Sequence, residues 1–275
     1  MSKTIVLTGA SDGIGAASAE TLVSLGHQVI LVGRSAEKTR AVARRVGADQ
    51  YLLADYTKLS DVRDLADALR DRLDRIDVLA NNAGGLFAGP VATQDGFEKT
   101  FQVNHLAPFL LTHQLTDVLL ASDAAVINTS SIGARLFGNI DIDDLNNFHH
   151  FTPNKAYGDA KLANILFTKG LHARFHDQGL TSVAFHPGNV ATNFASDTTS
   201  YFRWVYHGFL KAFLISPEKG GRNLTHFITG QPGISWESGH FYGDNRRITR
   251  TNPQASDMAL IHQHWERSAE MLGIH

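Results

Sequence analysis

Short apolar runs alternate with longer amphipathic segments along the whole chain. The runs are rich in Val, Ile and Leu and have the length of buried strands, whereas the segments between them repeat apolar residues at helical spacing. This pattern predicts strands at residues 4–8, 29–32, 50–53, 77–80, 125–129, 182–185 and 240–242. Helices are predicted between them at residues 14–25, 36–46, 59–73, 95–120, 154–178 and 217–229. Strands joined by helical crossovers form parallel sheets, so we expect an α/β protein.

The alternation runs from end to end without a linker or an internal repeat. We therefore predict one doubly wound domain over residues 1–275, with a seven-stranded, mostly parallel sheet and helices on both faces. Two segments depart from the pattern: residues 132–153 are rich in Asn and Asp, and residues 188–216 are rich in aromatic residues. Because long loops in compact α/β domains usually carry function, we expect a substrate loop at 132–153 and a lid at 188–216.

The amino-acid composition excludes several classes of binding partner and of chemistry. The chain has 25 Lys and Arg against 27 Asp and Glu, so it lacks the basic excess with which proteins neutralise a nucleic-acid backbone. It contains no cysteine, which excludes disulfides, a thiol nucleophile and thiolate metal sites. The first residues include too few apolar positions for a signal peptide or a membrane span. We expect a mature protein that starts at Met1 and is cytoplasmic.

A glycine-rich turn follows the first predicted strand and opens an Ala-rich helix. Glycine lets a backbone approach a pyrophosphate closely, and the N-terminus of the helix offers free N–H groups and the positive end of its dipole. Such a turn between a first strand and a helix predicts a dinucleotide site on a Rossmann fold. The residues that we expect to bind the cofactor here are Gly9, Ser11, Asp12, Gly13, Ile14 and Gly15.

The residues at the end of the second predicted strand indicate whether the cofactor is NAD(H) or NADP(H). A carboxylate at this point would bind the 2′-hydroxyl of NAD and repel the 2′-phosphate of NADP. The chain has Gly33, Arg34 and Ser35 there, and a guanidinium can bind phosphate oxygens at two points. We therefore favour NADP(H), with Arg34 and Ser35 at the phosphate, over NAD(H). The alternative is that Arg34 is a solvated residue at the start of the next helix.

Further motifs follow the later strands in a fixed order. They are Asn81-Asn82-Ala83-Gly84, Ser130-Ser131, Tyr157-Gly158-Asp159-Ala160-Lys161 and Pro187-Gly188-Asn189-Val190-Ala191-Thr192. Together with the glycine turn, this set resembles the short-chain dehydrogenase/reductase family over nearly the whole chain.

The resemblance implies a role for each matching residue. Tyr157 would be the catalytic acid/base with Lys161 as its partner, Ser131 would orient the substrate carbonyl, and Asn104 would support a proton-relay water. Lys161 would also hold the nicotinamide ribose, and Asp55 and Tyr56 would flank the adenine. The resemblance also assigns to the cofactor site Asn81, Ala83, Gly84, Tyr157, Pro187, Gly188, Val190 and Thr192.

The spacing of 26 residues from Ser131 to Tyr157, with the run that follows Lys161, resembles the retinol-dehydrogenase-like branch of this family. One departure is Ala160, which stands where a serine usually precedes the lysine. The family resemblance also implies a dimer or tetramer, although the aromatic segment could occupy the surface that such an interface needs.

The proposed catalytic pair makes chemical sense without the family. Tyr157 and Lys161 are four residues apart and therefore share a helix face. A phenol titrates near pH 10, and an adjacent ammonium favours the phenolate, which suits proton transfer near neutrality. Our leading hypothesis is an NADP(H)-dependent oxidoreductase that transfers hydride between the nicotinamide and an alcohol or carbonyl group of a bulky apolar substrate. The alternative is a non-catalytic NADP(H)-sensing protein on the same fold.

Two remaining features have competing interpretations. Residues 201–215 place Arg203, His207 and Lys211 as a thin polar stripe on an apolar helix, which suits a substrate lid, a subunit interface or a helix on a membrane surface. We favour the lid. The histidine pairs at 172 and 176 and at 262 and 264 have no third ligand placed by sequence, so we predict no metal site.

Overall fold

A seven-stranded parallel sheet forms the centre of the protein. The computed structural model describes residues 2–188 and 216–274. The strand order is β3-β2-β1-β4-β5-β6-β7, and every neighbouring pair is parallel. Each strand lies within one residue of its predicted bounds: β1 (Thr4–Thr8), β2 (Gln28–Gly33), β3 (Gln50–Leu53), β4 (Val78–Asn81), β5 (Ala125–Thr129), β6 (Thr181–Phe185) and β7 (His240–Tyr242).

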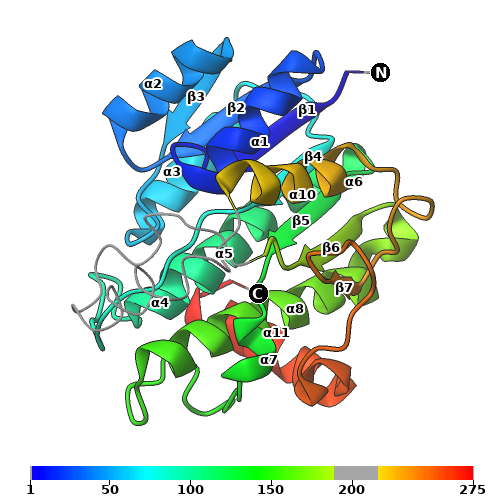
Figure 1. The fold of residues 1–275 in the computed structure, drawn as a ribbon. Helices are drawn as coiled ribbons and strands as arrows, with labels where there is room; N and C mark the ends of the chain where they lie inside the picture. Colours follow the sequence, from blue (N-terminus) through cyan, green and yellow to red (C-terminus); the bar gives the residue numbers. More distant parts are fainter. Residues whose placement is uncertain (1, 189–215, 275) are drawn as a thin grey trace.

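Helices cover both faces of the sheet, as predicted. One layer holds α1 (Gly13–Ser24), α2 (Ala36–Val46) and α10 (Pro217–Thr229), and the other holds α3 (Leu59–Arg70), α5 (Ala107–Gln114) and α8 (Pro153–Phe175). Alternate residues of each strand serve the two layers, since Ile5 and Leu7 pack beneath α1 whereas Val6 packs on the opposite side. In Figure 1, α1 and α10 lie side by side over one face of the sheet.

The segment predicted as one helix at 95–120 is interrupted. It consists of α4 (Lys99–Phe101), a π-helical turn η1 (Gln102–Leu106), α5 and α6 (Thr116–Ala121). Pro108 has no N–H and cannot make the α-helical bond to the carbonyl of Asn104, so the local sequence disfavours a regular helix here. The correction matters because η1 carries Asn104, and π-helical turns are frequent at functional sites.

A further helix, α11 (Met258–Met271), follows the last strand, where we had predicted none. Trp265 packs its ring against Phe109 of α5 at 4.9 Å and against Phe167 of α8 at 5.6 Å, so α11 covers the outer faces of both helices. The periodic pattern was hidden because its buried positions include the polar residues His264 and Ser268.

The predicted substrate loop at 132–153 is partly ordered as α7 (Gly133–Leu136) and is tied to the C-terminal region. Asn252 Nδ2 donates to the Gly138 carbonyl at 2.6 Å, and the Gln254 side chain bonds both the N–H and the carbonyl of Ile140 at 2.8 Å. The predicted lid at 188–216 lies outside the described residues except for its two end positions. Within the described ranges, no helix is both long and apolar enough to cross a bilayer.

Candidate active site

The turns that follow β1 and β4 form one unit where the strand order reverses, which is the usual ligand site of an open α/β sheet. Thr8 Oγ1 accepts from the backbone N–H groups of Asn82 and Ala83, both at 3.0 Å. The two backbones lie so close that a Cβ on Gly9 would be 2.8 Å from Ala83 Cα. Gly9, Ala83 and the strand ends are therefore brought together, as predicted for a cofactor cradle.

The glycine turn leads into α1 with the geometry of an anion site. A Cβ on Gly15 would collide with the Gly9 carbonyl oxygen, so the close approach requires glycine. Asp12 caps the helix by accepting from the Gly13 N–H at 2.8 Å and forms an ion pair with Lys38 at 3.5 Å. Ile14 is half-buried on the first turn of α1.

The ends of β2 and β3 place the predicted adenosine-side residues. Ser11 lies beside Gly33, where a glycine Cβ would be 3.0 Å from the serine Cβ. Arg34 is exposed, and the Ser35 side chain caps α2 by accepting from the Lys38 N–H at 3.3 Å. The Asp55 carboxylate is half-buried and accepts from the Thr57 N–H and hydroxyl.

Two residues predicted for the cofactor site turn away from it. The Tyr56 ring lies in the core between the sheet and α3, and burial raises the pKa of its phenol. Asn81 donates its amide to Asn128 Oδ1 at 3.0 Å and to Thr112 Oγ1 at 3.1 Å, which directs its side chain into the protein. Both side chains therefore belong to the protein interior behind the strand ends.

Ser131 and Tyr157 meet next to Gly133. Ser131 follows β5, and its Oγ accepts from the Gly133 N–H at 3.1 Å. A Cβ on Gly133 would lie 3.1 Å from the Tyr157 ring and 3.5 Å from Ser131 Oγ. Tyr157 stands on the first turns of α8, which Thr152 caps by accepting from the Lys155 N–H at 3.1 Å. The serine hydroxyl and the phenol ring thus lie close to one another, and both residues are half-buried.

Asn104 and Lys161 converge on Gly84 from two helices. A Cβ at Gly84 would be 2.5 Å from Asn104 Oδ1 and 3.1 Å from Lys161 Nζ. The Asn104 amide is fixed on both sides, because Oδ1 accepts from the Gly85 N–H at 3.1 Å and Nδ2 donates to the Gly85 and Thr100 carbonyls at 2.8 Å. Asn104 and Lys161 therefore lie beside the β4 turn, and Lys161 in turn lies near Tyr157, with its Nζ 5.6 Å from the centre of the phenol ring.

Lys161 is the most strongly perturbed of these groups. Its side chain is 2% exposed, its Nζ donates to the Thr129 carbonyl at 3.2 Å, and Nζ lies 5.6 Å from the centre of the Tyr157 ring. Burial lowers the pKa of Lys161 to about 7. Its ammonium is therefore close to losing its proton at neutral pH, a feature that spacing alone did not indicate.

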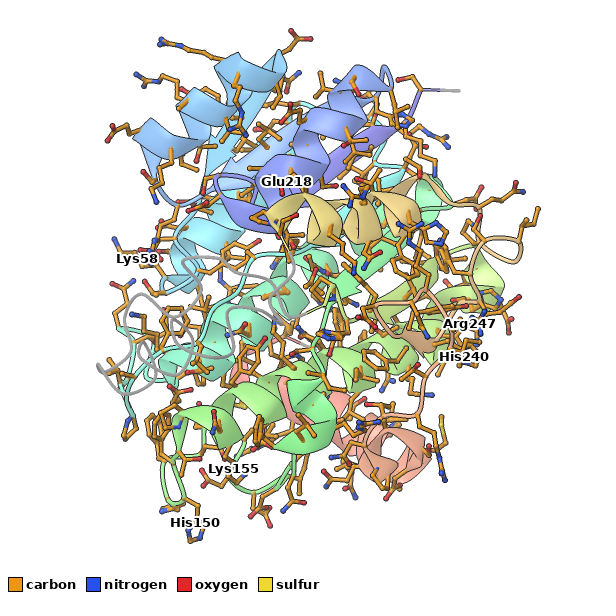
Figure 2. All side chains as sticks on the ribbon, viewed as in Figure 1. Lys58, His150, Lys155, Glu218, His240 and Arg247 are labelled. Atoms are coloured by element: carbon orange, nitrogen blue, oxygen red, sulfur yellow. The ribbon has the colours of Figure 1, made fainter. Side chains whose placement is uncertain are left out.

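Asp159, between Tyr157 and Lys161 in the chain, is a supporting residue that sequence reasoning missed. It is buried, accepts from the Asn139 N–H at 2.6 Å and forms an ion pair with Lys155 at 2.5 Å. Burial raises the pKa of its carboxyl, and Lys155 opposes that shift. Figure 2 shows Lys155 at the start of α8, near the loop that contains His150. Asp159 thereby fixes the loop after Ser131 to the helix that carries Tyr157; the spacing of four between Lys155 and Asp159 was the available signal.

The segment after β6 is only partly described. Pro187 and Gly188 are buried, and Asn223 of α10 donates to the Pro187 carbonyl at 3.1 Å. Val190 and Thr192 lie outside the described residues. Among the residues with described positions, no group of three or more His, Asp or Glu could hold a metal ion, and the rings of His172 and His176 simply stack at 4.4 Å.

The arrangement fits a dinucleotide cofactor. The cradle at Gly9 and Gly15 is closed to any side chain, and the N-terminus of α1 opens onto it. The four catalytic candidates lie at the neighbouring strand ends, within the same carboxyl edge of the sheet.

Comparisons with known proteins agree with this geometry. The family model for short chain dehydrogenase matches residues 3–201. A Streptomyces sp. (strain C5) protein provisionally named daunorubicin C-13 ketoreductase DnrU is 39% identical, with 98% of this chain and 93% of that protein covered. Human retinol dehydrogenase 13 is 34% identical over 99% of this chain and 85% of its own length. The solved structure of an uncharacterized protein from Mycobacterium Paratuberculosis has 31% identity and a TM-score of 0.78, covering 99% and 94% of the two chains. The chain therefore belongs to the short-chain dehydrogenase family of oxidoreductases, in its retinol-dehydrogenase-like branch.

Proposed function

We propose that this protein is an NADP(H)-dependent carbonyl reductase or alcohol dehydrogenase that acts on a bulky apolar substrate. The observation that carries the proposal is the convergence of Ser131, Tyr157 and Lys161 beside the glycine cradle. A protein that only sensed a nucleotide would not need a hydroxyl, a phenol and a buried amine at one point.

Backbone groups of the Gly9–Gly15 turn would hold the pyrophosphate, Lys161 would reach the nicotinamide ribose, and Arg34 would meet the 2′-phosphate. When bound, the nicotinamide supplies or accepts the hydride. The exposure of Arg34 at the end of β2 supports NADP(H) over NAD(H), since the described residues there place no carboxylate at position 33, 34 or 35.

Ser131 and Tyr157 would act on the substrate oxygen. In the direction of reduction, Ser131 Oγ donates a hydrogen bond to the carbonyl oxygen, and the Tyr157 hydroxyl gives its proton to the oxygen as negative charge develops there. In oxidation the phenolate takes the proton back. The Tyr157 ring and Ser131 Oγ both lie within about 3.5 Å of one point beside Gly133, which supports their acting on the same oxygen.

Lys161 would supply charge and a proton from behind the phenol. With a pKa near 7, it is charged in about half of the molecules at neutral pH. A phenolate or a substrate alkoxide would increase that fraction by Coulombic attraction. Its bond to the Thr129 carbonyl directs Nζ toward this site.

Apolar side chains on the predicted substrate loop support the substrate class. Leu136, the last residue of α7, and Phe137, which follows it, are 56% and 45% exposed, and Phe148 on the same loop is 40% exposed. Exposed apolar groups beside a catalytic site are typical of a binding wall for apolar molecules.

The test is the loss of nicotinamide absorbance when the protein meets NADPH, and separately NADH, with bulky apolar aldehydes and ketones that include retinal. We expect turnover with NADPH preferred. Tyr157→Phe should lower turnover by about a thousandfold or more because it removes the transferred proton, while NADPH affinity stays within about twofold.

Loss of both turnover and NADPH binding in Tyr157→Phe would contradict the role of the phenol. Tight NADPH binding by the wild type without turnover on any carbonyl would favour the sensing protein instead.

A further inference from the structure

His105 follows Asn104 in η1 and is completely buried. Its ring lies among aromatic rings, with centroid distances of 5.2 Å to Phe101 and 6.0 Å to Phe167, and it stacks on His264 of α11 at 4.6 Å. Nε2 lies 3.0 Å from the hydroxyl of Ser268, also on α11. Nδ1 is buried and has no hydrogen bond within standard geometry.

Asn164 stands on α8, close to one turn after Lys161, and is also buried. Its Nδ2 donates to the Thr129 carbonyl at 3.3 Å, and Lys161 Nζ donates to that same oxygen at 3.2 Å. Its Oδ1 is buried and, like His105 Nδ1, has no hydrogen-bond partner. One carbonyl therefore holds both the catalytic amine and this amide.

The two unsatisfied atoms are complementary. The π-helical turn that carries His105 packs against α8, where the His105 ring lies 6.0 Å from Phe167, three residues after Asn164. Burial and His264 lower the pKa of His105, and Asn164 opposes that shift. An unpaired buried polar atom costs about 1–3 kcal/mol, so the pair gains by bonding to each other. With the proton on Nδ1, His105 would donate to Asn164 Oδ1 after a small adjustment of either side chain, and Nε2 would accept from the Ser268 hydroxyl.

We propose that His105 is a positioning residue for Lys161. It holds the Asn164 amide with Nδ2 toward the Thr129 carbonyl, and this carbonyl in turn directs the Lys161 ammonium. The helix α11 completes the chain of bonds through Ser268. Without His105, no donor holds Oδ1, so the amide can turn away from the Thr129 carbonyl and that carbonyl loses one of the two donors that fix it beside Lys161. The functional part of this inference rests on the proposed catalytic role of Lys161, whereas the tautomer does not.

The first test reads the tautomer directly by ¹⁵N NMR of the histidine-labelled protein, with the His105 signals assigned by their absence from His105→Phe. We expect the Nδ1–H tautomer in the wild type and a shift to Nε2–H in Asn164→Leu, because the acceptor for Nδ1 is gone. An Nε2–H tautomer in the wild type would overturn the proposal whether or not the protein turns over a substrate.

The second test is kinetic. His105→Phe keeps a ring but loses the hydrogen-bond donor. Because one buried hydrogen bond is lost, we expect kcat to fall about tenfold, while KM for NADPH stays within about twofold of the wild-type value. His105→Asn restores an N–H near the Nδ1 position and should recover kcat to within about threefold of the wild type.

Thr225→Val is the matched control for these variants. Thr225 pairs with Ser18 through buried hydroxyls at 2.9 Å in the opposite layer, so this variant loses stability but should keep kcat. Wild-type kcat in His105→Phe, or equal losses in His105→Phe and His105→Asn, would overturn the proposal. Absence of turnover in the wild type would instead count against the proposed function, and the NMR result would still decide the bonding.

Discussion

At the ends of β1 and β4 the protein brings two backbones together by leaving out side chains, whereas at the end of β5 and the start of α8 it buries polar side chains. Gly9 and Gly15 define the first region, and its hydrogen bonds use backbone groups and Thr8. Lys161 and Asp159 of α8 define the second, together with Asn104 of η1, which lies near Lys161, and each is held by specific acceptors or donors.

We call the first the nucleotide region and the second the catalytic region. The difference between them indicates which substitutions and which changes of pH each region should tolerate. Close backbone contact has no charge to titrate, so the nucleotide region should be insensitive to pH but intolerant of a single methyl group. Buried amines and carboxyls carry large desolvation costs, so the catalytic region should tolerate small changes of volume but respond to pH. Three predictions test this contrast, in order of decreasing effect.

Gly15→Ala should have the largest effect on the nucleotide region. The added Cβ meets the Gly9 carbonyl oxygen and displaces the turn, so we expect NADPH to bind about a hundredfold more weakly, near 3 kcal/mol. The loss should be the same at pH 6 and pH 9, since no group titrates in the contact. Isothermal titration calorimetry at both pH values measures it.

The control is Glu20→Ala, an exposed position on the same helix, which should bind NADPH as the wild type does. Wild-type affinity in Gly15→Ala, or a loss that varies strongly with pH, would remove the distinction between the two regions.

Lys161→Met should change the stability of the protein by an amount that depends on pH, unlike the pH-independent effect of Gly15→Ala. Burial lowers the pKa of Lys161 from 10.5 to about 7, so below pH 7 the folded protein holds a charge at full desolvation cost. Between pH 7 and 10.5 the unfolded chain binds more protons than the folded one, and wild-type stability therefore rises with pH. We expect the variant to be more stable than the wild type by about 2 kcal/mol at pH 6, and the difference to shrink toward pH 10.

Denaturant titrations at pH 6, 8 and 10 measure this difference. Lys58→Met, at an exposed lysine at the edge of the molecule labelled in Figure 2, should show no such trend. A difference between Lys161→Met and the wild type that stays constant with pH would mean that the amine is solvated in the folded protein.

The same contrast explains what could be predicted from the sequence. The seven strands and the glycine turn were predictable, because apolar periodicity and glycine spacing are local properties. The four catalytic candidates came from the motifs of the family, and the structure brings them together at Gly84 and Gly133.

What the sequence did not reveal depends on contacts between distant segments. The burial of His105 by α11 and the ties from Asn252 and Gln254 to the substrate loop join residues more than a hundred positions apart. The inward direction of Asn81 depends on Asn128 and Thr112, which neighbouring elements supply. No local pattern encodes such partners, and buried polar residues in α11 even concealed the helix itself.

Arg34→Ala should produce the smallest effect and tests the charged side chain that we assign to the choice between NADP(H) and NAD(H). Arg34 is exposed, so the proposed bond to a 2′-phosphate would be screened by solvent, and we expect NADPH affinity to fall about tenfold, near 1.4 kcal/mol. NADH affinity should stay within about twofold, and added salt should reduce the NADPH effect. Arg44→Ala, an exposed arginine near the end of α2, is the control and should leave both affinities unchanged. Equal losses for NADPH and NADH in Arg34→Ala would mean that the guanidinium contacts a part shared by both cofactors, and the choice between them would then reside in the neighbouring backbone rather than in charge.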